Sequence, residues 1–224
     1  MMSKVHEIFP LVVYQGNIDC HSEFKQYTDE LKQYWFNGYE NESPEYSGRI
    51  FLHTEEKYEP FFDDLKKNID DYMTHLNVDH EKLSYFVSKS WVGYHNKEVP
   101  ALNVHSHNEA SISFVYYLKS SDNSDKFCVS QSKNVNENTG GLFETGKQRN
   151  IIKGFNKYNC NNYTITPHEG SVLIFPSNVL HSTLKMSEQE DERIVIAGDV
   201  RVTLKPEYQN YHQGCTHPTK WLEL

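Results

Sequence analysis

The chain has 224 residues, and its 22 Lys and Arg against 31 Asp and Glu give a formal net charge of −9 at pH 7. This acidic balance, without a cluster of basic residues, argues against duplex nucleic acid as a partner. No segment approaches the roughly 18 consecutive apolar residues that a membrane-spanning helix needs. We therefore expect no membrane association and a cytoplasmic protein, and the length suits one well-buried domain.

The first third of the chain has the apolar spacing of helices. In residues 21–38, aromatic and aliphatic side chains recur at intervals of three and four. Residues 59–77 carry a second apolar stripe, with Pro60 in the first turn, where proline is tolerated. We therefore predict a helix over each of these two ranges.

From about Leu83 onward the sequence changes to segments rich in aromatic and β-branched residues, which are typical of strands. The expected strands are 83–95, 112–119, 163–167, 171–176 and 193–204. Helices followed by strands indicate an α+β chain. We expect a double-stranded β-helix, or jelly roll, of about eight strands, padded by the N-terminal helices. Residues 1–224 would form a single domain, helical over about 1–80 and with its jelly-roll core at about 83–205.

The stretch NVHSHNEASISFVYYLK, residues 103–119, places two histidines one residue apart before a strand. Because alternate residues of a strand face the same side, His105 and His107 can bind one metal ion. The chain has 12 histidines, so this pair by itself is weak evidence. Glu109 has the same parity and is an alternative to His107 as a ligand.

A third histidine follows a predicted buried strand in HEGSVLIFPSNVLHSTL, residues 168–184. Gly170 offers a turn, an apolar run follows, and Pro176 ends the hydrogen bonding of that strand. His181 is then presented where the chain returns to the mouth of the predicted barrel. It is either a third metal ligand or a hydrogen-bonded structural residue.

Arg193 begins the strand in DERIVIAGDV, twelve residues after His181. An arginine at the head of a strand that otherwise reads as core is costly to bury unless it holds an anion. The alternative is an exposed Arg193 that pairs with Asp191 or Glu192. Its position relative to His181 favours the anion-binding interpretation.

Three segments together resemble a known family. SWVGYHNKEVPALNVHSHNEASISFVYYL, EGSVLIFPSNVLHSTL and ERIVIAGDV are similar to the 2-oxoglutarate/Fe(II)-dependent oxygenases of cyanophages and marine bacteria, and distantly to prolyl hydroxylases. The shared pattern is a strand with SW, an HxH, an S-x-x-Y-Y strand, F-P-S-x-x-x-H and a strand that begins with E-R. The resemblance covers roughly residues 83–205, and GRIFLH near residue 48 also resembles the N-terminal part of the family.

The resemblance implies Fe(II) and 2-oxoglutarate as cofactors, with His105, His107 and His181 as the metal ligands and catalytic residues. The commonest ligand set of such enzymes is two histidines and one carboxylate. Here His107 stands in the carboxylate position. A three-histidine face leaves the charge of the ferrous ion to be neutralised by the anionic co-substrate, and it would also accept Zn²⁺ or Ni²⁺.

The resemblance also implies which residues bind 2-oxoglutarate. Arg193 would form a bidentate pair with the far carboxylate of the co-substrate, a geometry that suits guanidinium. Ser113 and Tyr117 match the S-x-x-Y-Y positions, where the second tyrosine donates its hydroxyl to the same carboxylate in prolyl hydroxylases. A buried strand residue with a satisfied hydroxyl is the alternative for Tyr117.

The expected activity is hydroxylation of an unidentified substrate, a small molecule or a protein side chain, with release of succinate and CO2. One alternative is a cupin-type three-histidine dioxygenase that does not use 2-oxoglutarate; in such an enzyme Arg193 would have no assigned function. Another is a non-catalytic jelly-roll module that only binds a ligand. The sequence leaves the substrate and a homodimer open, and a viral origin would place the protein in the host cytoplasm.

Overall fold

The computed structural model describes residues 4–39, 51–96, 101–122, 124, 126–143, 147, 149–184, 191–209 and 216–223. Its α-helices are α1 (His21–Phe24), α2 (Thr28–Tyr39) and α3 (Glu59–His75). The strands are β1 (Tyr14–Asn17), β2 (Leu83–His95), β3 (Ile112–Lys119), β4 (Lys126–Ser130), β5 (Asn162–Ile165), β6 (Ser171–Pro176), β7 (Leu180–Leu184) and β8 (Arg193–Leu204). The first residues of the GRIFLH segment, 48–50, lie outside the described residues.

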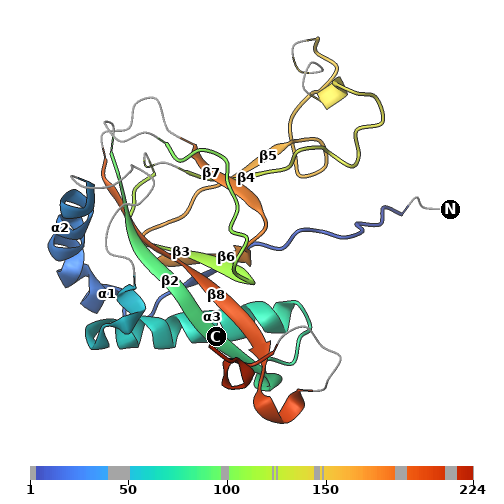
Figure 1. The fold of residues 1–224 in the computed structure, drawn as a ribbon. Coiled ribbons are helices and arrows are strands. Elements are labelled where there is room, and N and C mark those ends of the chain that lie inside the picture. Colours follow the sequence, from blue (N-terminus) through green and yellow to red (C-terminus); the bar gives the residue numbers. More distant parts are fainter. Residues whose placement is uncertain are drawn as a thin grey trace.

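The described strands form two antiparallel sheets (Figure 1). The five-stranded sheet has the order β1-β6-β3-β8-β2, and the three-stranded sheet has the order β5-β4-β7. The long strands β2 and β8 pair from Leu83 opposite Leu204 to His95 opposite Arg193, with one irregularity near Val87. Helices and antiparallel sheets in one chain agree with the mixed class expected from the sequence.

The two predicted helices are present, with one difference. Residues 59–75 form α3, with Pro60 in its first turn as predicted. The predicted helix over 21–38 is divided into α1, a short 3-10 helix (Lys25–Tyr27) and α2. None of the helices in the described part of the chain is long and apolar enough to cross a membrane.

Alternate residues of the five-stranded sheet face opposite sides, and the two sides have different contents. We call the side against the helices the outer face and the side toward the three-stranded sheet the inner face. On β3, the buried apolar cluster of the outer face takes Ile112, Phe114, Tyr116 and Leu118. Strands β2, β6 and β8 supply Val92, Val172, Ile174, Ile194 and Ile196 to the same cluster.

Helix α3 covers the outer face with aromatic side chains. The ring centroid of Phe61 lies 6.2 Å from that of Phe114 and 5.0 Å from that of Tyr116. Phe61 is fully buried, and Leu65 and Ile69 on the same side of the helix are at most 2% exposed. Because α3 presents one apolar stripe at helical spacing, it seals this face of the sheet.

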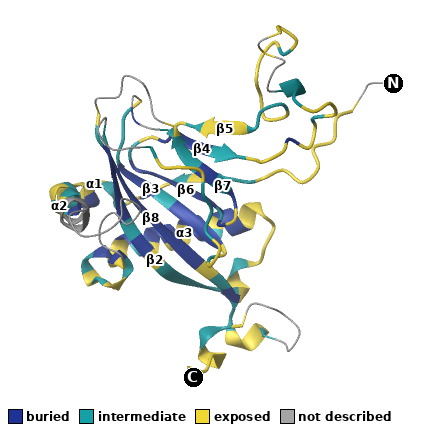
Figure 2. Cartoon of the chain, turned by 45° about the horizontal axis from the view of Figure 1, so that its top comes forward, coloured by how far each residue is buried: buried dark blue, intermediate teal, exposed yellow. Residues whose placement is uncertain are grey.

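The inner face carries a smaller apolar cluster together with polar residues. Leu173 and Phe175 of β6 and Val195 of β8 pack there against Phe127 of β4. In Figure 2 the five-stranded sheet is mostly buried, while β5 and the connection from β4 to β5 are largely exposed. The described residues of that connection, 131–143, 147 and 149–161, project away from the sheets in Figure 1.

A candidate metal centre on the inner face

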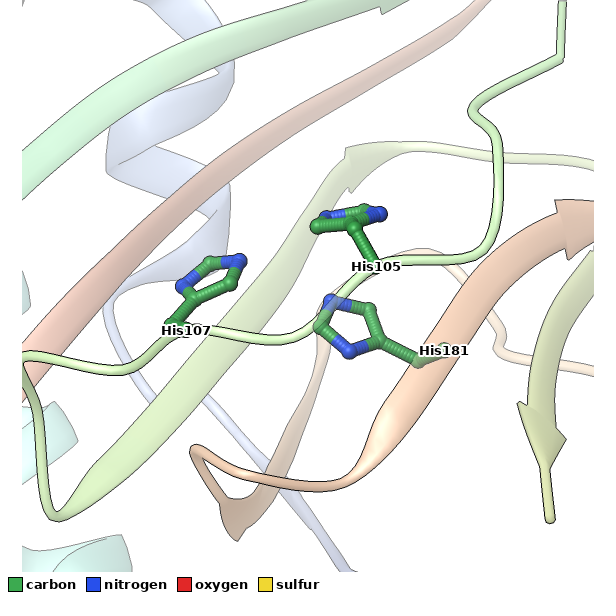
Figure 3. Close-up of side chains that lie close together, drawn as sticks. All are labelled: His105, His107 and His181. Atoms are coloured by element: carbon green, nitrogen blue, oxygen red, sulfur yellow. The ribbon is translucent and has the colours of Figure 1, made fainter. Parts of the chain in front are cut away.

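The three predicted histidine ligands meet where an extended segment joins the edge of the three-stranded sheet. His105 forms a single antiparallel bridge with His181 of β7, with both N–H···O distances at 2.9 Å. The His107 N–H donates to the Ser177 carbonyl at 2.8 Å. The pair therefore lies on an extended segment before β3 rather than in a regular strand, and both rings turn to the same side (Figure 3).

The three imidazoles form one cluster. One ligand atom from each of His105, His107 and His181 can be chosen so that all lie within 4.8 Å of one another. The ring centroids of His105 and His181 are 4.3 Å apart, and those of His107 and His181 are 5.2 Å apart. Figure 3 shows the rings gathered around a common space.

The outer nitrogen of each ring is held by an oxygen acceptor. The Nδ1 atoms donate to the Asn103 carbonyl (His105, 2.7 Å), to Asp199 Oδ1 (His107, 2.5 Å) and to the Val179 carbonyl (His181, 2.9 Å). Since carbonyl and carboxylate oxygens accept here, these bonds place a proton on each Nδ1, and in the neutral ring they leave the Nε2 lone pair available. This is the second bond that metal-binding histidines usually make.

His181 is the most buried of the three, with 6% of its surface exposed. Its ring lies 4.9 Å from that of Phe175 and 5.6 Å from that of Phe127. The pKa of His181 is lowered to about 4, chiefly because the ring is buried in these aromatic surroundings; the Val179 carbonyl opposes the shift, and the neighbouring histidines contribute to it. The ring is therefore neutral at pH 7, the form that binds a metal.

Glu109, the alternative to His107, does not join this cluster. Its side chain is 76% exposed, and its carboxylate lies 3.5 Å from the Lys89 ammonium. Although Glu109 lines the same cavity, the group of potential ligands in the described chain consists of the three histidines.

Arg193 and Tyr117 lie together further along the inner face. Arg193 is 2% exposed, and its Cζ lies 5.9 Å from the centroid of the Tyr117 ring. Tyr117 is fully buried, and its hydroxyl has no hydrogen-bond partner among the described residues. Burial raises the pKa of Tyr117 to about 12, against the opposing effect of Arg193. The phenol is therefore a neutral donor without an acceptor among the described residues, which is costly unless a ligand accepts its hydrogen bond.

One cavity of about 470 Å³ connects the histidine cluster with Arg193 and Tyr117. All six residues predicted for the site line it, namely His105, His107, Ser113, Tyr117, His181 and Arg193. Its walls also include Trp91 and His95 of β2, two residues that were not predicted from the sequence to belong to the site. The Trp91 ring lies 5.7 Å from that of His107.

Ser113 lies at the His107 end of the cavity. Its hydroxyl donates to Asp199 Oδ1 at 2.7 Å, and Ser113 pairs with Asp199 in the sheet, whereas Arg193 pairs with His95. A contact between Ser113 and 2-oxoglutarate stays a prediction. Asp199 and Arg193 are six residues apart on β8, so the alternation of side chains along the strand places both on the same face of the sheet.

These residues fit a metal ion and an anionic co-substrate. Three imidazole ligands on one side leave the other coordination positions of an iron centre open for further ligands. A buried guanidinium beside an unsatisfied phenol supplies the charge and the hydrogen bond that a carboxylate needs. Both features follow from the described geometry.

Comparison with solved structures shows a shared fold. AviO1 from Streptomyces viridochromogenes Tue57 matches with 10% identity over 88% of this chain and 90% of that chain, at a TM-score of 0.52. A Pseudomonas putida prolyl-4-hydroxylase matches with 12% identity over 85% and 92%, at a TM-score of 0.51. HygX from Streptomyces hygroscopicus, with nickel and 2-oxoglutarate bound, has 15% identity over 85% and 82% and a TM-score of 0.48, too low to support an inference.

A search among curated proteins gave no match. A family model does match, and it covers the part of the chain that carries the cavity. Residues 89–199 match the family described as "Putative 2OG-Fe(II) oxygenase" and contain the three histidines, Tyr117 and Arg193. The match supports an oxygenase, and the cofactors are the Fe(II) and 2-oxoglutarate of that family.

Proposed function

We propose that the protein is a hydroxylase that uses Fe(II) and 2-oxoglutarate to convert a C–H bond of an unidentified substrate into C–OH. The observation that carries the proposal is one cavity with three converging imidazoles and, further along the same sheet face, a buried arginine beside an unsatisfied tyrosine hydroxyl. When bound, the iron and co-substrate supply the oxidation: one atom of O2 enters succinate, the other becomes the product hydroxyl, and CO2 leaves.

His105, His107 and His181 would hold the metal through Nε2. Their Nδ1–H groups are already engaged, so the rings need no reorientation to bind the ion. The aromatic rings of Phe127 and Phe175 pack against His181 and exclude water from that side. The protein thus provides a preorganised face with open positions opposite it.

Arg193 would bind the far carboxylate of 2-oxoglutarate, and Tyr117 would donate its hydroxyl to the same group. Both side chains are buried, so the pair would act in surroundings where water does not compete. Ser113 would be a third contact of the co-substrate, since it lines the same cavity.

The finer features of the proposal follow the family resemblance. The two facing sheets would form the double-stranded β-helix of a single domain over residues 1–224. The substrate would be a small molecule or a protein side chain, in the cytoplasm of a marine bacterium or of a cyanophage host. A homodimer is compatible with the chain.

An anaerobic titration tests the assignment. Apo protein receives Fe(II) and then 2-oxoglutarate, and the weak visible charge-transfer band of the chelated complex is recorded for wild type, Arg193→Ala and Arg193→Lys. We expect the band in wild type, at least 10-fold weaker co-substrate binding in Arg193→Ala, and partial recovery in Arg193→Lys, which keeps the charge but not the bidentate fork.

The other outcomes separate the alternatives. Iron binding without the band would overturn the use of 2-oxoglutarate and favour a cupin-type three-histidine dioxygenase. A chain that binds no iron would be a module that only recognises a ligand. Once the band is established, succinate release in the presence of candidate substrates identifies the reaction.

A further inference from the structure

Asp199 is a buried carboxylate in the wall of the cavity. It lies on β8 with 6% of its surface exposed. Its Oδ1 accepts one hydrogen bond from His107 Nδ1 at 2.5 Å and another from the Ser113 hydroxyl at 2.7 Å. The antiparallel pairing of β3 with β8 sets Ser113 directly opposite Asp199, so the sheet itself holds this arrangement.

The partner of His107 differs in charge from the partners of the other two histidines. His105 and His181 donate to backbone carbonyls, which are neutral. His107 donates to a carboxylate instead. A carboxylate on the outer nitrogen of an imidazole fixes the ring and makes its inner nitrogen a stronger base.

The position of this carboxylate matters because the cluster has no charged ligand of its own. Three imidazole ligands bring no negative charge to a divalent ion, whereas the usual ligand set includes one carboxylate. A carboxylate buried as deeply as Asp199 is costly unless a positive charge lies nearby. A divalent ion on the far side of the His107 ring would provide that charge.

We infer that Asp199 is a positioning residue that acts through His107, holding the ring and supplying the negative charge that a carboxylate ligand would otherwise contribute directly. This inference rests on the metal site of the proposed function. Asp199 acts from behind the ring because its Oδ1 is occupied by two donors, and the cluster of potential ligands does not contain it.

Ser113 has a supporting part in this arrangement. Its hydroxyl donates to the same oxygen that accepts from His107, which helps to hold the carboxylate against the His107 ring. The hydroxyl also lies 3.3 Å from His107 Nδ1. Removal of this hydroxyl leaves the charge of Asp199 in place and loosens its orientation.

Cobalt(II) binding to the apo protein tests the inference, because Co²⁺ in the site is read by its visible absorption and needs neither substrate nor turnover. Asp199→Asn keeps an oxygen acceptor for His107 but removes the charge, and Asp199→Ala removes both. The dissociation constant for Co²⁺ is expected to rise about 10-fold in Asp199→Asn and nearer 100-fold in Asp199→Ala, the range found for such outer partners of metal ligands. Ser113→Ala should have a smaller effect than either.

Asp64→Asn provides a matched control. Asp64 of α3 is equally buried, at 6% exposure, and accepts hydrogen bonds from the Cys20 N–H and the Lys67 ammonium, outside the cavity. Its change to asparagine should lower stability and leave the Co²⁺ affinity within about 2-fold of wild type. If Asp199→Ala fails to fold, Asp199→Asn, which has nearly the same shape, still carries the comparison.

A second readout separates charge from folding. In the complex with Fe(II) and 2-oxoglutarate, loss of negative charge behind His107 makes iron a poorer electron donor. The charge-transfer band of Asp199→Asn should therefore move to shorter wavelength, while that of Asp64→Asn stays in place. Wild-type affinity and an unmoved band in Asp199→Asn would overturn the inference and leave the proposed function intact, whereas a wild-type protein that binds no metal would overturn both.

Discussion

The two faces of the five-stranded sheet come from the same strands but have opposite contents. The outer face is apolar and closed by α3, with Phe61, Phe114 and Tyr116 in ring contact. The inner face buries polar groups, among them Arg193 and Asp199, around an open cavity. Residues one position apart on a strand therefore belong to different regions of the molecule.

This difference indicates that the outer face stabilises the fold and that the inner face carries the functional groups. Burial of apolar surface on the outer face stabilises the fold, at roughly 25 cal/mol per Å². Burial of charged and unsatisfied polar groups on the inner face costs stability, and it persists where a function needs it. Substitution of neighbouring residues on one strand can separate the two contributions.

The largest expected effect is on the outer face. Phe114→Ala removes a ring that is 1% exposed and packs against α3, so we expect the free energy of unfolding to fall by about 3–5 kcal/mol. The adjacent Val115→Ala, on the inner face beside the cavity, should cost about 1 kcal/mol, because two methyl groups are lost from a partly buried site. Urea unfolding measures both. Equal losses would contradict the contrast between the faces.

Gly198 tests how closely the outer face is packed. A Cβ at this position of β8 would lie 2.5 Å from the Lys89 carbonyl oxygen and 2.6 Å from the Phe114 ring. Gly198→Ala is therefore expected to destabilise the fold by about 1–3 kcal/mol, the usual cost of overpacking. Gly154→Ala, in the exposed β4–β5 connection with nothing near its Cβ position, should change stability by less than about 0.5 kcal/mol. Thermal unfolding of the two variants gives the comparison.

Two adjacent tyrosines separate stability from ligand binding. Tyr116 lies on the outer face of the sheet, where its hydroxyl is 2.7 Å from His21 Nδ1. Tyr116→Phe should therefore cost about 1 kcal/mol of stability and leave 2-oxoglutarate binding unchanged. Tyr117→Phe removes a buried hydroxyl without a described partner, so stability should hold or rise slightly. The affinity for 2-oxoglutarate should fall about 10-fold, the worth of a hydrogen bond to a charged group.

Unfolding curves and the charge-transfer titration measure both tyrosine variants. A weaker co-substrate affinity in Tyr116→Phe, or an unchanged affinity in Tyr117→Phe, would show that the two faces do not divide these roles. The two substitutions are chemically identical, so each serves as the control for the other.

The smallest effect is expected where α2 meets the strands. Glu192 pairs with Lys32 of α2, and it also accepts from Lys119 of β3 and Tyr94 of β2. These bonds lower the pKa of the Glu192 carboxyl from 4.5 to about 2, and the bond from Lys32 makes the largest contribution. The carboxylate therefore contributes stability that is fully present above pH 4.5 and is lost as the pH falls through about 2.

Glu192→Gln should accordingly cost about 1 kcal/mol or less at pH 7, since the group is partly exposed to solvent. The difference from wild type should shrink steadily below pH 4.5. Unfolding measured between pH 7 and pH 3 follows this trend. A difference that is constant with pH would mean that the ion pairs do not hold the helix to the sheet.

Much of the fold was readable from local patterns. The bounds predicted for β2, β3, β6 and β8 agree with the structure, because each is a run of aromatic and β-branched residues bounded by turn residues. Strands β1, β4 and β7 were not predicted, and β5 (Asn162–Ile165) begins and ends slightly earlier than the predicted range 163–167. The sequence of β1, YQGN, is short and polar, and it becomes a strand only because β6 offers an edge for it to pair with.

The sequence by itself determined which residues share a face, because side chains alternate along an extended chain whatever its neighbours are. That periodicity alone places His105 with His107, and Arg193 with Asp199. Only the tertiary structure decided which of these residues contact one another. It pairs His105 with His181 in a β-bridge, and it joins His107 by a hydrogen bond to Asp199, 92 residues away. Such contacts depend on strand order and register, which are set by the packing of the whole sheet and not by any local stretch.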